Sequence, residues 1–341
     1  MLKVFLFICL FLALLRGFSV GTDVEGYTEN FMRMTSDPAT WNYQMPFEPG
    51  FNVIILILKK AGNPMLCWGI ISCVYIYGAY SFFRKYSKKA NIAWFLFIAM
   101  GSYFLCYNIM RQCFALGIIM ILVSKFGLLK NEKTIILIYI LTILLCAFLF
   151  HSTMLILLII PILNNKVIRQ NFNSYVLIVF VIVSFFLGVG NHVADFIASL
   201  LGFGNIEGKF VNYAMQNIKT DDIAGYSTVR LLVNSLFCIS LLYSDRRNET
   251  SLFRLLYVSS ICFFNLFGNI VIEFARVGEV LLLWGIIYIE SIYSGNIRYS
   301  CLNKCLIFLF SIVSYVNILL KGYGGIIPYT FDKNLIYYIF N

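Results

Sequence analysis

The amino-acid sequence predicts an all-α polytopic integral membrane protein. Of its 341 residues, 60% are hydrophobic and only 12% are charged. Apolar runs long enough to cross a hydrocarbon core of about 30 Å as helices recur along the chain, separated by short polar breaks. A water-soluble domain cannot bury that much apolar surface. We therefore expect about 10–11 transmembrane helices in a single polytopic membrane domain that covers residues 1–341.

The charge pattern supports this class and excludes a nucleic-acid-binding protein. The net charge is +10, but the basic residues gather in short breaks such as RKYSKK at 84–89 and DRRNET at 245–250. Basic inter-helix loops are typical of the cytoplasmic side of membrane proteins, whereas a nucleic-acid-binding face concentrates its cations in one stripe. Most of the ten cysteines lie in apolar runs, and Cys301 and Cys305 lack the partner ligands of a zinc site. We therefore expect no metal.

The apolar runs place the spans in order. The first run, at 1–21, is interpreted as an uncleaved helix instead of a signal peptide, because further spans and no secreted domain follow it. Residues 51–60 are too short to span and are expected to form an interfacial or re-entrant helix. Outer segments are expected at about 16–63 and 195–227, and the carboxy-terminal tail is also placed outside. The remaining spans are expected near 64–83, 90–108, 113–128, within 134–163, and near 174–194, 228–243, 252–272, 277–293 and 303–320.

One histidine interrupts the apolar stretch 134–163. Both flanks of this stretch are basic, which places both on the cytoplasmic side, yet the stretch is too short for two full crossings of about twenty residues each. The pattern predicts a shortened or re-entrant helical hairpin whose turn lies near His151. A polar turn at membrane depth must be surrounded by protein or water. His151 is then either a functional group in an outer cavity or a neutral residue that bonds a helix carbonyl.

Several other polar groups are expected on the same outer side. Arg111 and Gln112 lie at the outer end of one span, Arg230 begins a later span, and Arg276 lies between two more. Arginines that converge near an outer cavity with an imidazole suit a phosphorylated lipid, because guanidinium binds phosphate oxygens with two hydrogen bonds and keeps its charge when desolvated. Acids in the first outer segment are candidates for steering a sugar hydroxyl or taking its proton.

These residues together resemble the EpsG-type branch of the Wzy-like polysaccharide polymerases. Arg276 matches the family's late arginine, although the nearby aromatic residue expected in the family is missing. The other matching elements, in order, are Arg16, Val20, Gly21, Thr22, Asp23 and Tyr27; Glu48, Gly50 and Phe51; Asn108, Arg111, Gln112 and Ala115; and Phe150 with His151.

The resemblance implies an enzyme of the bacterial inner membrane, a glycosyltransferase that polymerises oligosaccharide repeat units of O-antigen or exopolysaccharide. The repeat units are carried on undecaprenyl diphosphate, and the site faces the periplasm or outside. No cofactor is implied, because the lipid diphosphate is the carrier of the substrate. A GT-C-like membrane architecture is compatible with this reading, and membrane lipid and a chain-length regulator are implied partners. The residues expected to bind the substrate or its diphosphate are Arg111, Gln112, Arg276, Arg230, Arg16, Tyr27 and Asn108.

The catalytic base remains open among three residues. Transfer to an incoming hydroxyl requires a group that accepts its proton, and the candidates are His151, Asp23 and Glu48. Three other functions compete with polymerisation: a flippase or exporter of the lipid-linked unit, a lipid-sugar-dependent transferase that modifies the polysaccharide, and a membrane acyltransferase. Polymerisation is favoured because the halves of the chain show no internal symmetry and the outer segments are long.

Overall fold

The computed structural model describes most of the chain as helices. It describes residues 2–34, 47–130, 132–189, 227–245, 251–268, 272–295, 299–320, 322 and 325–332. The expected outer segment 195–227 lies outside the described residues apart from Ser227. In the described part, an isolated antiparallel bridge between Arg16 and Phe331 is the one pairing of extended residues.

The helices confirm the all-α polytopic membrane class, and within the described residues most of the spans expected from residue 64 onward coincide with helix. Within the described residues, three helical segments are long and apolar enough to cross a membrane: α5 (Pro64–Tyr86), residues Arg276–Ser294 of α16 (Ile272–Ser294), and α17 (Ser300–Leu320). Shorter apolar helices are α1 (Leu2–Leu14), α4 (Pro49–Lys59), α6 (Ala90–Ala99), α8 (Lys133–Leu149), α11 (Ser174–Val189), α14 (Thr228–Ser244) and α15 (Leu252–Phe267). The remaining elements are α2 (Val24–Arg33), α7 (Met110–Phe126), α9 (Ile159–Leu163), α10 (Lys166–Asn171) and the 3-10 helices η2 (Ser102–Tyr107) and η3 (Ser152–Leu158).

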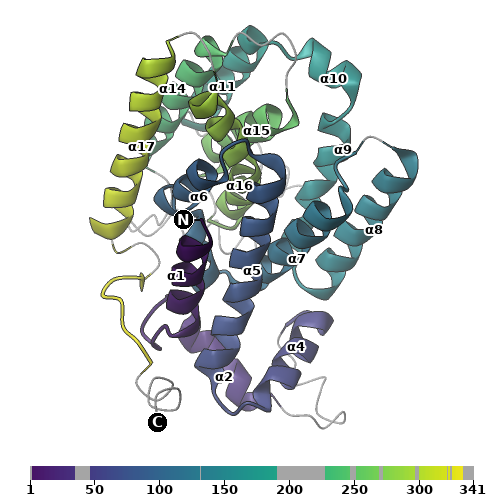
Figure 1. Ribbon diagram of the computed structural model, residues 1–341, viewed down its shortest axis with the longest axis vertical. Helices are drawn as coiled ribbons and strands as arrows, with labels where there is room; N and C mark the ends of the chain where they lie inside the picture. Colours follow the sequence, from purple (N-terminus) through teal and green to yellow (C-terminus); the bar gives the residue numbers. More distant parts are fainter. Residues whose placement is uncertain are drawn as a thin grey trace, which may run out of the picture. The chain divides into compact units, whose positions relative to one another are not determined.

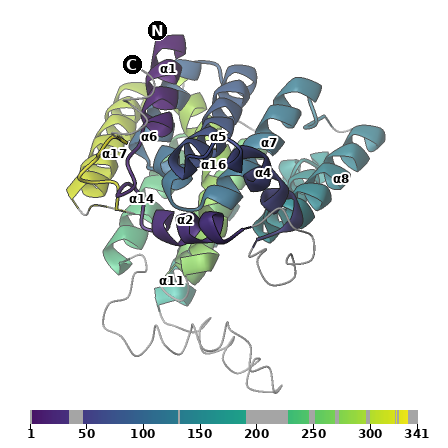
Figure 2. The same cartoon turned by 90° about the horizontal axis from the view of Figure 1, so that it is seen from below.

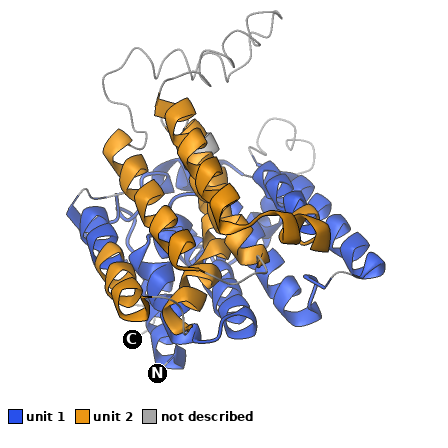
Figure 3. Cartoon of the chain, turned by 90° about the horizontal axis from the view of Figure 1, so that it is seen from above, with its two compact units in different colours: residues 1–161, 311–341 blue, residues 162–310 orange. Residues whose placement is uncertain are grey.

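The chain divides into two compact units, coloured separately in Figure 3. Unit 1 comprises residues 1–161 and 311–341, and unit 2 comprises residues 162–310. The boundaries fall inside α9 and α17. All the motif residues between Arg16 and His151 therefore belong to unit 1, whereas Arg230 and Arg276 belong to unit 2.

The pair α5 and α7 forms the centre of unit 1. Glycines allow their backbones to touch, since a Cβ at Gly78 would lie 2.5 Å from the carbonyl oxygen of Gly117. Near the carboxy-terminal ends of both helices, the Tyr86 hydroxyl donates to the carbonyl oxygen of Val123 at 3.1 Å. The two helices thus run in the same direction. Both begin at the end of unit 1 where α2 and α4 lie, which Figure 1 shows from the side and Figure 2 from below.

The connection between α5 and α7 departs from the single span expected at 90–108. Helix α6 ends at Ala99, because Gly101 adopts a positive φ of 92° that a regular helix does not accommodate. The chain continues as η2, whose carbonyl at Ser102 accepts a 2.8 Å hydrogen bond from the Tyr75 hydroxyl. This irregular backbone is buried in protein, as the bilayer requires of non-helical segments.

The reversal predicted near His151 is present. Helix α8 ends at Leu149, His151 has extended backbone angles (φ −167°, ψ 125°), and η3 then runs back along α8. The Tyr139 hydroxyl of α8 donates to the carbonyl oxygen of Leu157 in η3 at 2.9 Å, which fixes the two arms side by side. The stretch 134–163 is therefore a hairpin with His151 at its turn.

Unit 2 is tied together by buried polar side chains. The amide of Asn265 on α15 donates to the hydroxyls of Ser184 on α11 and Ser235 on α14, each at 3.0 Å. At the other end of α15, the fully buried Arg254 lies 3.7 Å from the carboxylate of Asp245 and bonds to Ser174. Hydrogen bonds between apolar helices are favourable because hydrocarbon offers no other partner.

We expect Gly117→Ala to destabilise unit 1. Its Cβ would lie 2.6 Å from the Cα of Tyr75, so the backbones of α5 and α7 must separate, and overpacking of this kind costs about 1–3 kcal/mol. Gly26→Ala on α2 is the matched control, because its Cβ meets nothing within 4 Å. Thermal unfolding of both variants in detergent measures the difference. An unchanged melting temperature for Gly117→Ala would contradict the close packing.

Candidate functional site

The motif residues of unit 1 meet where α2 and α4 pack against the first turns of α5 and α7. A buried aromatic cluster forms the base of this region. Tyr27 stacks on Phe47 with ring centroids 5.4 Å apart and packs on Trp68 at 5.6 Å. The indole nitrogen of Trp68 also donates to the Thr28 hydroxyl at 3.1 Å. These contacts hold α2 against α5 and fix the position of Tyr27.

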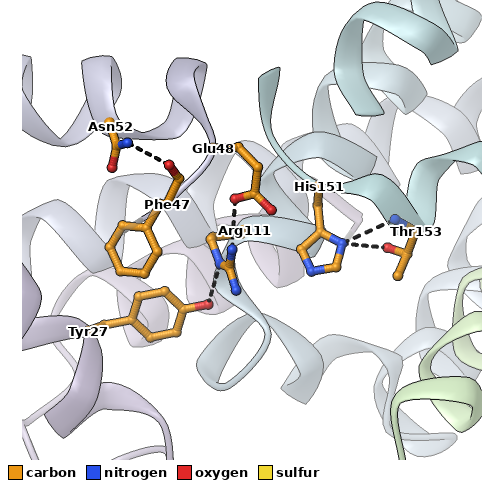
Figure 4. Close-up of polar contacts among 7 residues, drawn as sticks. All are labelled: Tyr27, Phe47, Glu48, Asn52, Arg111, His151 and Thr153. Carbon is orange, nitrogen blue, oxygen red and sulfur yellow. Dashed lines mark hydrogen bonds and ion pairs between the residues drawn. The ribbon is translucent and has the colours of Figure 1, made fainter. Parts of the chain in front are cut away.

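Arg111 lies at the centre of the site, in the first turn of α7. Its Nη1 donates to Glu48 Oε2 at 2.7 Å, and its Nε donates to the Tyr27 hydroxyl at 3.3 Å (Figure 4). Its guanidinium also lies 5.1 Å from the centre of the Phe47 ring. The side chains of Arg111 and Glu48 keep 28% and 25% of their surface exposed. The pair is therefore held firmly yet remains accessible from outside the protein.

Tyr27 completes this arrangement as a neutral phenol. The side chain is 9% exposed, and burial raises its pKa above the ordinary value, although Arg111 acts in the opposite direction. Its oxygen accepts the hydrogen bond from Arg111, so its own O–H group can donate elsewhere. Tyr27 can thus contribute a donor beside the guanidinium.

The sequence Glu-Pro-Gly-Phe explains how Glu48 reaches Arg111. Glu48 is the residue before α4, with extended angles (φ −61°, ψ 151°), and Pro49 occupies the first helical position, which suits its fixed φ. Gly50 allows α4 to approach the end of α8, since a Cβ there would lie 2.7 Å from Leu149 Cβ. The glycine therefore brings Glu48 close to the turn that contains His151.

His151 is held in one tautomer by its neighbour. The backbone N–H of Thr153 donates to His151 Nδ1 at 3.2 Å, and the Thr153 hydroxyl lies 2.8 Å from the same nitrogen. Because a backbone N–H can only donate, Nδ1 is the acceptor and the neutral ring carries its hydrogen on Nε2. Figure 4 shows that the ring edge away from Thr153 faces Arg111 and Glu48. His151 therefore presents a hydrogen-bond donor to the site.

The first motif, from Arg16 to Asp23, packs against the residues that precede α7. Asn108 Oδ1 accepts from the backbone N–H of Thr22 at 2.7 Å and from its hydroxyl at 3.1 Å. Gly21 has a φ of 109°, and a Cβ there would lie 2.3 Å from the carbonyl oxygen of Tyr107. Asp23 is partly exposed at the start of α2, one turn before Tyr27. Asn108 thus acts on the scaffold, and Asp23 lies at the edge of the site.

Arg16 and Gln112 are buried instead of exposed. Arg16 is 0% exposed, with Nη1 donating to the Cys106 carbonyl at 3.4 Å, Nη2 lying 3.2 Å from Met110 Sδ, and the guanidinium 5.1 Å from the centre of the Tyr107 ring. Gln112 is 1% exposed within α7. Arg16 thus contacts residues at the start of α7, whereas Arg111, Glu48, Tyr27 and His151 come together at the partly exposed site.

Two contacts that hold the segments of unit 1 together have no clear signal in the sequence. Lys59, at the end of α4, donates through Nζ to the carbonyl oxygens of Phe31 at 2.6 Å and Met32 at 3.1 Å, which caps the end of α2. The carboxy-terminal residues pair with the segment after α1, since Gly17 N donates to the Thr330 carbonyl at 2.7 Å. Both contacts join segments that are remote in sequence, so no local pattern predicts them.

Two of the arginines predicted to converge with Arg111 belong to unit 2. Arg230 lies in the first turn of α14 and Arg276 in α16, both partly exposed and both in unit 2. Their approach to Arg111 stays a prediction. Within the described residues, no three His, Cys, Asp or Glu side chains gather as they would around a metal ion.

We expect Glu48→Gln to weaken the attachment of α4 to α7. The charge-assisted bond to Arg111 is lost, and because both side chains are about one-quarter exposed the cost is about 1 kcal/mol. Glu29→Gln is the matched control, since its pair with Arg33 is formed by side chains that are 58% and 73% exposed. Melting temperatures in detergent compare the two; equal shifts would show that the Arg111–Glu48 contact has no special weight.

Among the comparisons with known proteins, one family model matches this chain. Neither a search of curated proteins nor a search of solved structures finds a similar chain. The family model for the EpsG family matches residues 2–331, nearly the whole length, and includes every residue of the site described above. The chain therefore belongs to the EpsG family.

Proposed function

We propose that this protein is a membrane polymerase that joins oligosaccharide repeat units carried on undecaprenyl diphosphate. Membership of the EpsG family supports a polysaccharide-polymerase role in general, and the apolar helices embed the chain in a membrane. The observation that carries the finer proposal is the partly exposed Arg111, fixed between Glu48 and Tyr27 beside His151. In this proposal the protein lies in the bacterial inner membrane, and the site faces the periplasm.

The diphosphate of the donor binds at the head of α7. Arg111 uses Nη1 and Nε to hold Glu48 and Tyr27, which leaves Nη2 directed to a phosphate oxygen. The amino-terminal end of a helix carries about half a positive charge, which adds to that of the guanidinium. Donors on His151 Nε2 and the Tyr27 hydroxyl complete a set that favours an anion.

The reaction transfers the growing chain from its carrier to a hydroxyl of the incoming unit. The hydroxyl oxygen attacks the anomeric carbon, the bond from that carbon to the diphosphate oxygen breaks, and undecaprenyl diphosphate leaves with the bonding electron pair. Arg111, Tyr27 and His151 stabilise the negative charge that develops on the leaving group. A general base must accept the proton of the attacking hydroxyl.

Glu48 is the best-placed carboxylate for that proton. Its Oε2 is engaged by Arg111, and Oε1 remains outside this ion pair and can accept the proton. Asp23, whose Oδ1 accepts the Thr22 hydroxyl at 3.2 Å, is the second candidate because it lies one turn from Tyr27. His151 is less suited to the role of base, because its unprotonated nitrogen already accepts from Thr153.

The function is tested by the polysaccharide made in a strain that carries Arg111→Ala or His151→Ala. We expect both variants to abolish long polymer while single repeat units still reach the surface, because the diphosphate loses its main ligands. Arg33→Ala, an exposed arginine on α2, is the control that keeps the ladder. Absence of all surface units would indicate export instead, and a full ladder with altered sugars would indicate a modifying transferase; either result overturns the proposal.

The donor role of His151 makes a separate prediction. Glutamine places an amide N–H close to the position of Nε2, so His151→Gln should retain measurable polymer, whereas the aromatic but apolar His151→Phe should retain none. If His151 were instead the base, glutamine and phenylalanine would be equally inactive. The measurement is the ladder length and total polymer of the two strains at matched protein levels.

A further inference from the structure

A cavity lined by basic, hydroxyl and aromatic side chains lies at the opposite end of α5 and α7 from Arg111. Its volume is about 340 Å³, and its lining includes Arg84, Lys85 and Lys125 together with Tyr80, Ser81 and Ser124. Arg111 and Lys125 both lie on α7, fourteen positions apart, which corresponds to about 21 Å along the helix axis at 1.5 Å per residue. The cavity is therefore separate from the candidate active site.

The positive charge at this cavity exceeds what the negative ends of α5 and α7 can offset. Each helix end carries about half a negative charge, so the ends of α5 and α7 together offset about one of the three cations. No acidic residue lines the cavity, and within the described residues none of the three cations forms an ion pair. A surplus of about two positive charges remains, which suits an anionic ligand.

The side chains are arranged so that donors surround the opening. Arg84 lies 5.6 Å from the centre of the Tyr80 ring and donates to the Tyr80 hydroxyl at 3.4 Å, which orients the guanidinium. Lys125 is exposed and lies 5.6 Å from the centre of the Phe126 ring. The Ser81 hydroxyl lines the cavity and can donate to an oxygen acceptor. Phosphate oxygens match this set of donors.

Exposed aromatic residues indicate where the rest of the ligand lies. Tyr77 belongs to the lining and is 49% exposed, and Phe126 follows Lys125 with 59% exposure. Phe126 is the last residue of α7, and Tyr77 lies two turns before Arg84 on α5. Aromatic side chains are typical of the boundary between headgroups and hydrocarbon. The basic break that follows Arg84 also predicts that this end faces the cytoplasm, where the leaflet is rich in anionic lipid.

We propose that this cavity binds the phosphate-bearing headgroup of an anionic phospholipid. Arg84, Lys85 and Lys125 neutralise the phosphate, and the Ser81 hydroxyl donates to one of its oxygens. The glycerol and the first acyl carbons lie against Tyr77 and Phe126. The proposal requires that the chain is embedded in a membrane, and it is independent of the polymerase reaction.

The test uses the full chain in nanodiscs. We compare discs of phosphatidylcholine alone with discs that also contain phosphatidylglycerol, and we measure the melting temperature and the number of lipids retained in native mass spectrometry. The test variant is Lys85→Gln with Lys125→Gln, which leaves the contact between Arg84 and Tyr80 intact. The matched control is Lys133→Gln with Lys304→Gln, two exposed lysines outside the cavity.

We expect phosphatidylglycerol to raise the melting temperature of the wild type and of the control by several degrees. The test variant should lose most of this shift and retain fewer phosphatidylglycerol molecules, while its melting temperature in phosphatidylcholine stays near that of the wild type. Equal shifts in all three proteins would overturn the proposal, because they would reflect general charge attraction. Equal stabilisation by inorganic phosphate in phosphatidylcholine discs would also overturn it, since the ligand would then be a soluble anion.

Discussion

The charge of Arg111 is the constraint on which unit 1 depends. A guanidinium at the head of an apolar helix is costly unless it is paired, and its partners here are Glu48, the Tyr27 hydroxyl and the Phe47 ring. Each partner comes from the segment that precedes or begins α4, or from α2. The arrangement of α2 and α4 is therefore coupled to one cation, and the cation in turn remains partly exposed.

Small residues make this coupling possible. Gly21 lets the segment before α2 pass against the carbonyl of Tyr107, and Gly50 lets α4 lie against the end of α8. Gly78 and Gly117 bring α5 and α7 into backbone contact, so the head of α7 has a fixed position. Side chains at any of these positions would meet backbone or Cβ atoms at less than 3 Å. The close approach of these backbones thus brings Arg111 and its partners within reach of one another.

The two ends of the α5 and α7 pair carry different chemistry. At one end a single arginine is paired with a carboxylate and faces neutral donors, whereas at the other end three cations line a cavity without acids. Such a distribution is compatible with the two proposed ligands, a lipid diphosphate at one end and an anionic headgroup at the other. Since α5 and α7 run in the same direction, the Arg111 site lies where both helices begin and the basic cavity lies toward their other ends.

The sequence by itself determined the membrane class, most of the helical segments and the reversal at His151, because span length, apolar composition and flanking charge are local properties. It also singled out Arg111, Tyr27, Glu48 and His151 through their resemblance to one family. Only the tertiary structure decided which of these residues touch, since Glu48 and Tyr27 lie 63 and 84 positions from Arg111 in the chain. Burial of Arg16, the capping of α2 by Lys59 and the pairing of Gly17 with Thr330 likewise depend on long-range packing. The tautomer of His151 rests on a contact with Thr153, whose geometry is set by the backbone of the turn.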